Sequence, residues 1–202
     1  MAALDVLCDL NVIEQSLVPV RPSQVNRSRG GGVQGQESAF MWWRSSFSTT
    51  ALTQAEDALF QSVMARIGVS SDGFLCHDLF RPRPVLAVAP LTQPTATLTA
   101  IAARTVSISG GQVGLVLSPG DYIELRDAAG GRVLNTVSDS VTIDAGGVAD
   151  VALDFPLNTA RFVVGDVVNF ERASCVMKRV QPAGRNYQTT SVTCSFEAEE
   201  VA

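Results

Sequence analysis

The chain has 202 residues, of which 46% are hydrophobic and 17% charged, and its formal net charge is -5 at neutral pH. This apolar content excludes a disordered protein, and the length suffices for one large domain or two small ones. The acidic balance argues against a nucleic-acid-binding surface, because neutralising phosphates requires clustered Lys and Arg. No apolar run approaches the roughly 20 residues that span a bilayer, and residues 1–17 lack the basic start of a signal peptide. We therefore expect no membrane contact and a protein kept in the cytoplasm, or in an assembly built there.

The four cysteines are scattered along the sequence, at Cys8, Cys76, Cys175 and Cys194, without the CxxC spacing of metal or redox motifs. In a reducing compartment such cysteines are free, buried thiols that act as small apolar residues. Disulfides and a metal site are the remaining alternatives.

The first 36 residues divide into a mixed segment and a polar one. Residues 4–20 hold mixed apolar and polar positions, which indicates one or two short strands. Residues 22–36 are rich in Gly, Ser, Asn and Arg, and they predict a long flexible loop. The pairing of arginines with Gly30, Gly31 and Gly32 lacks the GxxxxGK[ST] pattern of a phosphate-binding loop, so a surface loop is the preferred interpretation.

An aromatic strand is predicted from Phe40 to Phe47. Alternation places Trp43 and Phe47 on one face and Phe40 and Trp42 on the other. Aromatic residues on both faces imply that both are covered, and the second cover is predicted to be another subunit, because Trp is enriched at interface centres. Phe40, Trp42, Trp43 and Phe47 are therefore candidate subunit-interface residues. The alternative is that both tryptophans belong to the core of the chain.

A helix is predicted over about 53–67. Thr53 is a suitable N-cap, Glu56 completes a capping box, and Gly68 stands where a left-handed C-terminal residue belongs. The apolar residues recur at helical spacing and predict one buried face; they are Leu59, Phe60, Val63, Met64 and Ile67.

The histidine at position 77, the only one in the sequence, lies in a predicted strand from Gly73 to Phe80. Neighbouring residues of a strand point to opposite faces, so Cys76 and His77 are not expected to form a catalytic pair. A zinc site lacks further ligands nearby. We predict that the chain is not an enzyme and identify no catalytic, cofactor-binding or metal-binding residues.

The remaining sequence predicts a second β unit. Between residues 95 and 171, short alternating segments are separated by Gly and Asp turns, which is typical of a small antiparallel barrel or sandwich. Two later strands, at 175–180 and 191–198, are expected to return to the first half. The predicted fold is therefore mainly β with one helix, comprising residues 1–93 plus 172–202, with a small antiparallel β-barrel inserted at 94–171.

The order of these features resembles the distal tail proteins of long-tailed bacteriophages and of gene transfer agents. The resemblance is carried by FMWWRSSFSTTALT, the helix TQAEDALFQSVMARIG, the strand GFLCHDLFRPRP, and then SPGDYIEL, VTIDAGGVADVALDFPL, VVGDVVNF, VMKRV and SFEAEE. It spans most of the chain and rests on order and pattern.

The resemblance implies a structural component of the virion tail, assembled in the host cytoplasm. Six copies would form a homohexameric ring at the end of the tail tube, joining the tail tube protein to hub and baseplate proteins. DNA would pass through the lumen without specific binding. Two alternatives remain: a carbohydrate- or partner-binding accessory module of the tail, and a ring protein of the tail tube or tail terminator.

Overall fold

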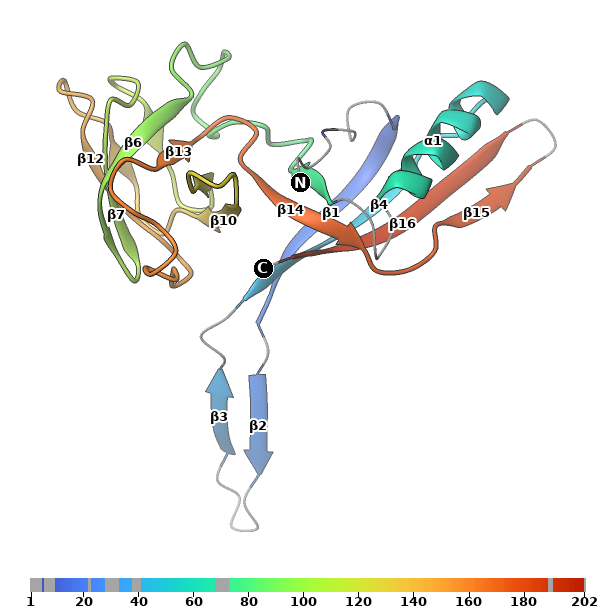
Figure 1. Cartoon of the computed structure of the whole chain (residues 1–202), viewed down its shortest axis with the longest axis horizontal. Coiled ribbons are helices and arrows are strands. Elements are labelled where there is room, and N and C mark those ends of the chain that lie inside the picture. Colours follow the sequence, from blue (N-terminus) through green and yellow to red (C-terminus); the bar gives the residue numbers. More distant parts are fainter. Residues whose placement is uncertain are drawn as a thin grey trace.

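The computed structural model describes residues 5, 10–21, 23–27, 33–37, 41–67, 73–188 and 191–201. Within these residues the chain is mostly antiparallel β-strand with a single α-helix (Figure 1), so the mainly β fold with one helix is confirmed. In chain order the elements are β1 (Val12–Val20), β2 (Ser23–Arg27), β3 (Val33–Glu37), β4 (Trp42–Thr49), α1 (Gln54–Arg66), β5 (Phe74–His77), β6 (Thr95–Ala102), β7 (Thr105–Ser109), β8 (Val116–Leu117), β9 (Tyr122–Arg126), β10 (Arg132–Thr136), β11 (Val141–Thr142), β12 (Ala149–Ala152), β13 (Val167–Asn169), β14 (Ser174–Arg179), β15 (Gly184–Tyr187) and β16 (Val192–Glu200).

The first sheet joins the two ends of the chain. Its strands lie in the order β1-β4-β16-β14-β5, and β15 pairs with β16. The C-terminal strands β14 and β16 pair with β5 and β4, which confirms that they return to the first half. Aromatic residues fill the core of this sheet, where the Phe47 ring stacks on Phe196 at 4.5 Å between centroids and meets Phe74 edge-on.

The helix α1 covers one part of the first sheet (Figure 1). The predicted capping box is present: the Thr53 amide donates to Glu56 Oε2 at 2.8 Å, and the Glu56 amide donates to Thr53 Oγ1 at 3.4 Å. The helix ends at the C-cap Ile67, and Gly68 lies outside the described residues. Leu59, predicted for the buried face, is 48% exposed.

The buried face of α1 is therefore narrower than its sequence suggests. Phe60, Val63, Met64 and Ile67 are buried, and the Phe60 ring meets Phe196 of β16 edge-on. This narrow stripe is enough to hold the helix on the sheet, because most helical stability comes from packing of one face.

Strands β2 and β3 pair with each other from Ser23↔Glu37 to Arg27↔Val33 and form a separate two-stranded sheet. We call this hairpin the arm. It leaves the first sheet where β1 ends and β4 begins, and it extends away from the body of the molecule (Figure 1). The loop predicted over 22–36 is therefore wrong at residues 23–27 and 33–36, which form strands, and the rest of that range lies outside the described residues. Backbone hydrogen bonds form the arm, and its sequence lacks the apolar alternation by which strands are recognised.

The second sheet contains only strands from the middle of the chain. Its order is β10-β9-β13-β6-β7-β12, with β8 and β11 forming a small two-stranded sheet. It curls until its end strands meet: the Ser138 amide donates to the Ala152 carbonyl at 2.9 Å, and the Asp154 amide donates to the Thr136 carbonyl at 3.0 Å. Its core is largely aliphatic. The expected second antiparallel barrel is thus present, and the proposed domain limits at 94 and 171 stay a prediction.

Candidate functional site

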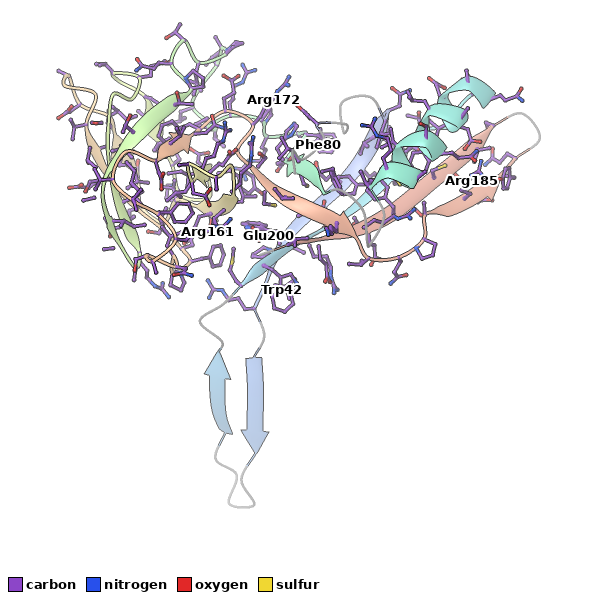
Figure 2. All side chains as sticks on the ribbon, viewed as in Figure 1. Trp42, Phe80, Arg161, Arg172, Arg185 and Glu200 are labelled. Atoms are coloured by element: carbon purple, nitrogen blue, oxygen red, sulfur yellow. The ribbon has the colours of Figure 1, made fainter. Side chains whose placement is uncertain are left out.

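The aromatic strand β4 places its two tryptophans in different environments. Trp43 is 1% exposed, whereas Trp42 is half-buried on the other face of the strand. Figure 2 shows Trp42 where β4 meets the arm. The alternation predicted for this strand is therefore correct, and the two residues must be considered separately.

Trp43 links the first sheet to the second. Its indole Nε1 donates a hydrogen bond to the carbonyl of Leu134 in β10 at 2.9 Å. Its ring meets Tyr122 edge-on at 5.8 Å and Phe155 at 6.0 Å. Buried tryptophans combine a large apolar area with a satisfied polar group in this way. Trp43 is therefore an internal anchor between the two sheets.

The predicted interface set is reduced by these observations. Trp43 and Phe47, at 1% and 2% exposure, lie in the chain's own core, so neither ring is available to another subunit. Phe40 lies outside the described residues. Aromatic residues on both faces of β4 predict a cover supplied by another subunit, but the second sheet of the same chain covers Trp43. Trp42 is the described member of the set that keeps accessible surface.

Trp42 also carries an unsatisfied polar group. Within the described part of the chain its indole Nε1 is buried and has no hydrogen-bond acceptor. A buried donor without a partner costs about 1–3 kcal/mol, so an acceptor supplied by a bound molecule would stabilise this position.

A cavity of about 240 Å³ lies at the same end of the first sheet, next to the second sheet. Mostly apolar residues line it, with a few polar ones: Met41, Trp42, Val133, Leu134, Asn135, Phe155, Pro156, Leu157, Asn158, Arg161 and Glu200. Figure 2 shows Arg161 on the second-sheet side and Glu200 at the end of β16. An apolar lining with a few polar groups is typical of binding pockets. This cavity is smaller than most of them, and its volume suits a single side chain or a compact ligand.

Glu200 is the titratable group of this cavity. It accepts a hydrogen bond from the Trp43 amide at 3.1 Å. Burial raises the pKa of its carboxyl to about 7, against the lowering effects of that hydrogen bond and of Arg161. The carboxyl is therefore partly protonated near neutral pH, and its charge depends on what fills the cavity.

A second polar junction joins the sheets around Glu124 of β9, which is completely buried. Glu124 accepts from Arg126 and Arg132 at 2.8 Å each. It also accepts from the amide of Ser174 at 2.9 Å. Because Ser174 begins β14, this carboxylate holds the returning chain against the second sheet. Breaking such a buried pair on one side is strongly destabilising.

Sequence reasoning missed Glu124 because alternation in β9 assigns only Ile123 and Leu125 to the core. All three residues are 0% exposed. The other face of β9 is covered by β14, and no local pattern announces that contact. The two-residue spacing of Glu124 and Arg126, which places both on one face of a strand, is the signal that could have indicated an ion pair.

Cys76 and His77 offer no activated nucleophile. Burial raises the pKa of the Cys76 thiol to about 12, and burial also lowers the pKa of His77. Cys76 is therefore a neutral thiol at physiological pH, whereas the thiolate is the reactive form. Cys8 lies outside the described residues.

The described residues contain no cluster of three or more His, Cys, Asp or Glu side chains placed to hold a metal ion. No helix among them has the length and apolarity required to cross a membrane. A comparison with protein-family models finds no match for this chain. No curated protein shows significant sequence similarity to it either.

Proposed function

We propose that this chain is a structural subunit of a phage-like tail and forms a ring at the distal end of the tail tube. The ring joins the tube to hub and baseplate proteins and leaves a channel through which DNA passes. The order of sequence features suggested this role. The arm is the single structural observation that carries it.

The arm supports assembly because a two-stranded hairpin has little stability by itself. Isolated hairpins are marginal in water, and three or more strands or a covering element are needed to stabilise them. The arm pairs with no third strand within the described chain and extends beyond the body (Figure 1). A neighbouring subunit or tail protein that packs against it would supply the missing contacts.

The edge strand β1 supports the same role. β1 has nine residues and, among the described residues, pairs only with β4. Its side chains Ile13 and Val18 are 49% and 45% exposed. A long edge with apolar side chains is a template for pairing with another chain. β1 is followed in the sequence by the first strand of the arm, so both features belong to the same end-to-end segment of the chain.

The connector between the sheets, residues 78–94, offers a separate apolar surface that suits contact with neighbouring tail proteins. Val85, Leu86 and Val88 are 58–99% exposed. The segment is nevertheless fixed, since the Val85 amide donates to the buried carboxylate of Asp121 at 2.9 Å. An apolar strip held rigidly at the surface needs little ordering when a partner binds.

The charge of the chain suits a conduit. Each copy carries a net charge of -5, so a closed ring of copies is strongly acidic. Such a ring does not attract the phosphates of DNA passing through it, because binding DNA requires clustered positive charge.

Electron micrographs of the purified protein and the protein composition of tail particles together test this proposal. Negative-stain micrographs of the purified protein are expected to show rings with a central hole, and mass spectrometry of purified tail particles should detect the chain. If images of tail particles place the chain along the tube, or at the end of the tube next to the head, the chain is a tube protein or a terminator ring protein instead. A strict monomer at high concentration that is absent from tail particles would overturn the proposal.

Binding of a glycan by the second sheet is the less favoured alternative. Sugar sites use exposed aromatic rings for stacking, but Phe155, Phe162 and Phe170 are each buried. Tyr122 is half-buried against Trp43. An array of surface glycans probed with the full chain would reveal such binding, and its absence would end this alternative.

A further inference from the structure

Cys76 and Cys175 lie directly opposite each other on the paired strands β5 and β14. The Sγ of Cys175 is 3.9 Å from the carbonyl oxygen of Cys76, and both residues are 0% exposed. Directly opposed residues of antiparallel strands have Cα atoms about 4.5–5.5 Å apart. Disulfides span Cα separations of about 4.4–6.8 Å. We propose that Cys76 and Cys175 form a cross-strand disulfide when the protein meets an oxidising environment.

The position of this pair gives the bond a structural role. The chain leaves the first sheet after β5 and returns to it at β14, so the two adjacent cysteines flank the whole second sheet in the sequence. They are 99 positions apart in the sequence. A disulfide here closes a loop around the second sheet and fixes its attachment to the first. Long closed loops restrict the unfolded chain most, in the entropic account of disulfide stabilisation.

The closed fold protects both thiols from reaction. Burial raises the pKa of Cys76 to about 12 and that of Cys175 well above its ordinary value. Oxidation therefore requires β5 to open. β5 is a four-residue strand at the end of its sheet, paired only with β14 in the described structure. Short edge strands open locally at lower free energy than a whole core.

A small-molecule disulfide such as oxidised glutathione supplies the oxidant. The thiolate of one cysteine attacks a glutathione sulfur, which forms a mixed disulfide and releases one glutathione thiolate. The second cysteine, as its thiolate, attacks the protein sulfur of that mixed disulfide and releases the second glutathione. The two protein thiols lose two electrons and two protons in total, and these are recovered in two molecules of reduced glutathione.

Cys194 provides a matched control. It is also buried, at 1% exposure, but the residue opposite it on β15 is Arg185. Its Sγ lies 4.0 Å from Asp57 Oδ1. A Cys194→Ser variant keeps the proposed pair, whereas Cys175→Ser removes it.

The experiment treats the full-length protein with oxidised glutathione, and in parallel with dithiothreitol, before digestion and peptide mapping by mass spectrometry. We expect a linked peptide containing Cys76 and Cys175 in the wild type and in Cys194→Ser, lost after reduction. The proposal would be overturned if Cys76 or Cys175 formed disulfides only with other cysteines. It would also be overturned if both thiols stayed free after prolonged oxidation in mild denaturant. Because the linked peptide is sought in the wild type, a folding defect of Cys175→Ser leaves the test decisive.

Two further readouts examine the role of the bond. The oxidised protein should melt about 10 °C above the reduced one. Disulfides that close long loops stabilise strongly, and in a chain of this size a modest gain in the free energy of unfolding raises the Tm by several degrees. A single proteolytic cut between residues 78 and 173 should leave the fragments together on a denaturing gel without reductant and separate them with it. Separation under both conditions would contradict the proposed connection.

Discussion

The two sheets differ in how their end strands are paired. The second sheet curls until β10 and β12 bridge, so its two ends satisfy each other through backbone hydrogen bonds. The first sheet keeps β1 at one end and β5 at the other, and it continues from β1 and β4 into the arm. Closed barrels remove the edges at which other chains add strands. We therefore expect assembly through added strands to involve the first sheet and the arm.

The two sheets also differ in the residues that form their cores. Aromatic rings are more frequent in the first core than in the second, whose large buried residues are mostly aliphatic. Leu134 of β10 and Phe155, which follows β12, also belong to the first core and enclose Trp43. The second sheet is thus complete in its strand pairing, whereas the first depends on it for part of its cover.

The largest expected effect separates the two adjacent tryptophans. Trp43→Ala empties the contact between the sheets and should lower the free energy of unfolding by about 3–5 kcal/mol. Trp42→Ala removes a half-buried ring with an unsatisfied N–H and should leave the monomer folded while weakening assembly. Denaturant titration and mass measurement on both variants check this pair. Equal losses of stability would contradict the assignment of Trp42 to the surface.

The buried carboxylate at the junction is expected to matter nearly as much. Glu124→Ala leaves the Arg126 and Arg132 guanidinium groups facing an empty position, which should cost about 3–5 kcal/mol. Asp150→Ala is the matched control in the same sheet, because its carboxylate accepts an exposed hydrogen bond from Ser107 and should cost less than about 1 kcal/mol. Chemical denaturation compares the two. A Glu124 effect as small as that of the control would remove the role of this group in holding the sheets together.

The cavity beside Trp42 predicts a pH dependence of intermediate size. The folded pKa of Glu200 is about 7, above its ordinary value of 4.5, so the folded state binds the proton more tightly. Its contribution to stability is fully present below about pH 4.5 and is lost as pH rises through 7, by roughly 1–3 kcal/mol.

His77, whose pKa is lowered by burial, acts in the opposite direction, because protonation of the unfolded chain at acidic pH favours unfolding. The difference between wild type and Glu200→Gln therefore isolates Glu200. Thermal or denaturant unfolding of both proteins between pH 5 and 8 should show the wild type losing stability relative to the variant as pH rises. Parallel curves would show that the carboxyl is not perturbed.

Local patterns predicted the elements that depend on local chemistry. The capping box at Thr53 and Glu56 correctly located the start of α1, and alternation correctly separated the faces of β4. The Gly-Asp turns indicated the short strands of the second sheet. Each of these signals operates within a few residues, where propensity and spacing decide the structure.

Contacts between distant segments could not be read in the same way. The burial of Trp43 depends on Leu134, and the burial of Glu124 depends on Ser174. Leu59 follows the helical period but faces solvent because α1 covers the sheet with a narrow stripe. The arm was not predicted, because its strands pair through backbone hydrogen bonds while their side chains lack the apolar alternation that marks a strand in a sequence. These features depend on how the two sheets and the arm are placed in space.

The role of the arm gives the most direct test of the account. In one variant Asn-Gly replaces residues 21–41 and closes a two-residue turn between Val20 and Trp42, which are opposite each other in the β1–β4 register. In its control Asn-Gly replaces only residues 28–32, so that Arg27 and Val33 remain paired. The measurement is the mass of each protein in solution at high concentration. We expect ring-sized assemblies for the wild type and the control, and a folded monomer for the variant without the arm. A monomeric wild type, or a variant without the arm that assembles like the wild type, would contradict this expectation.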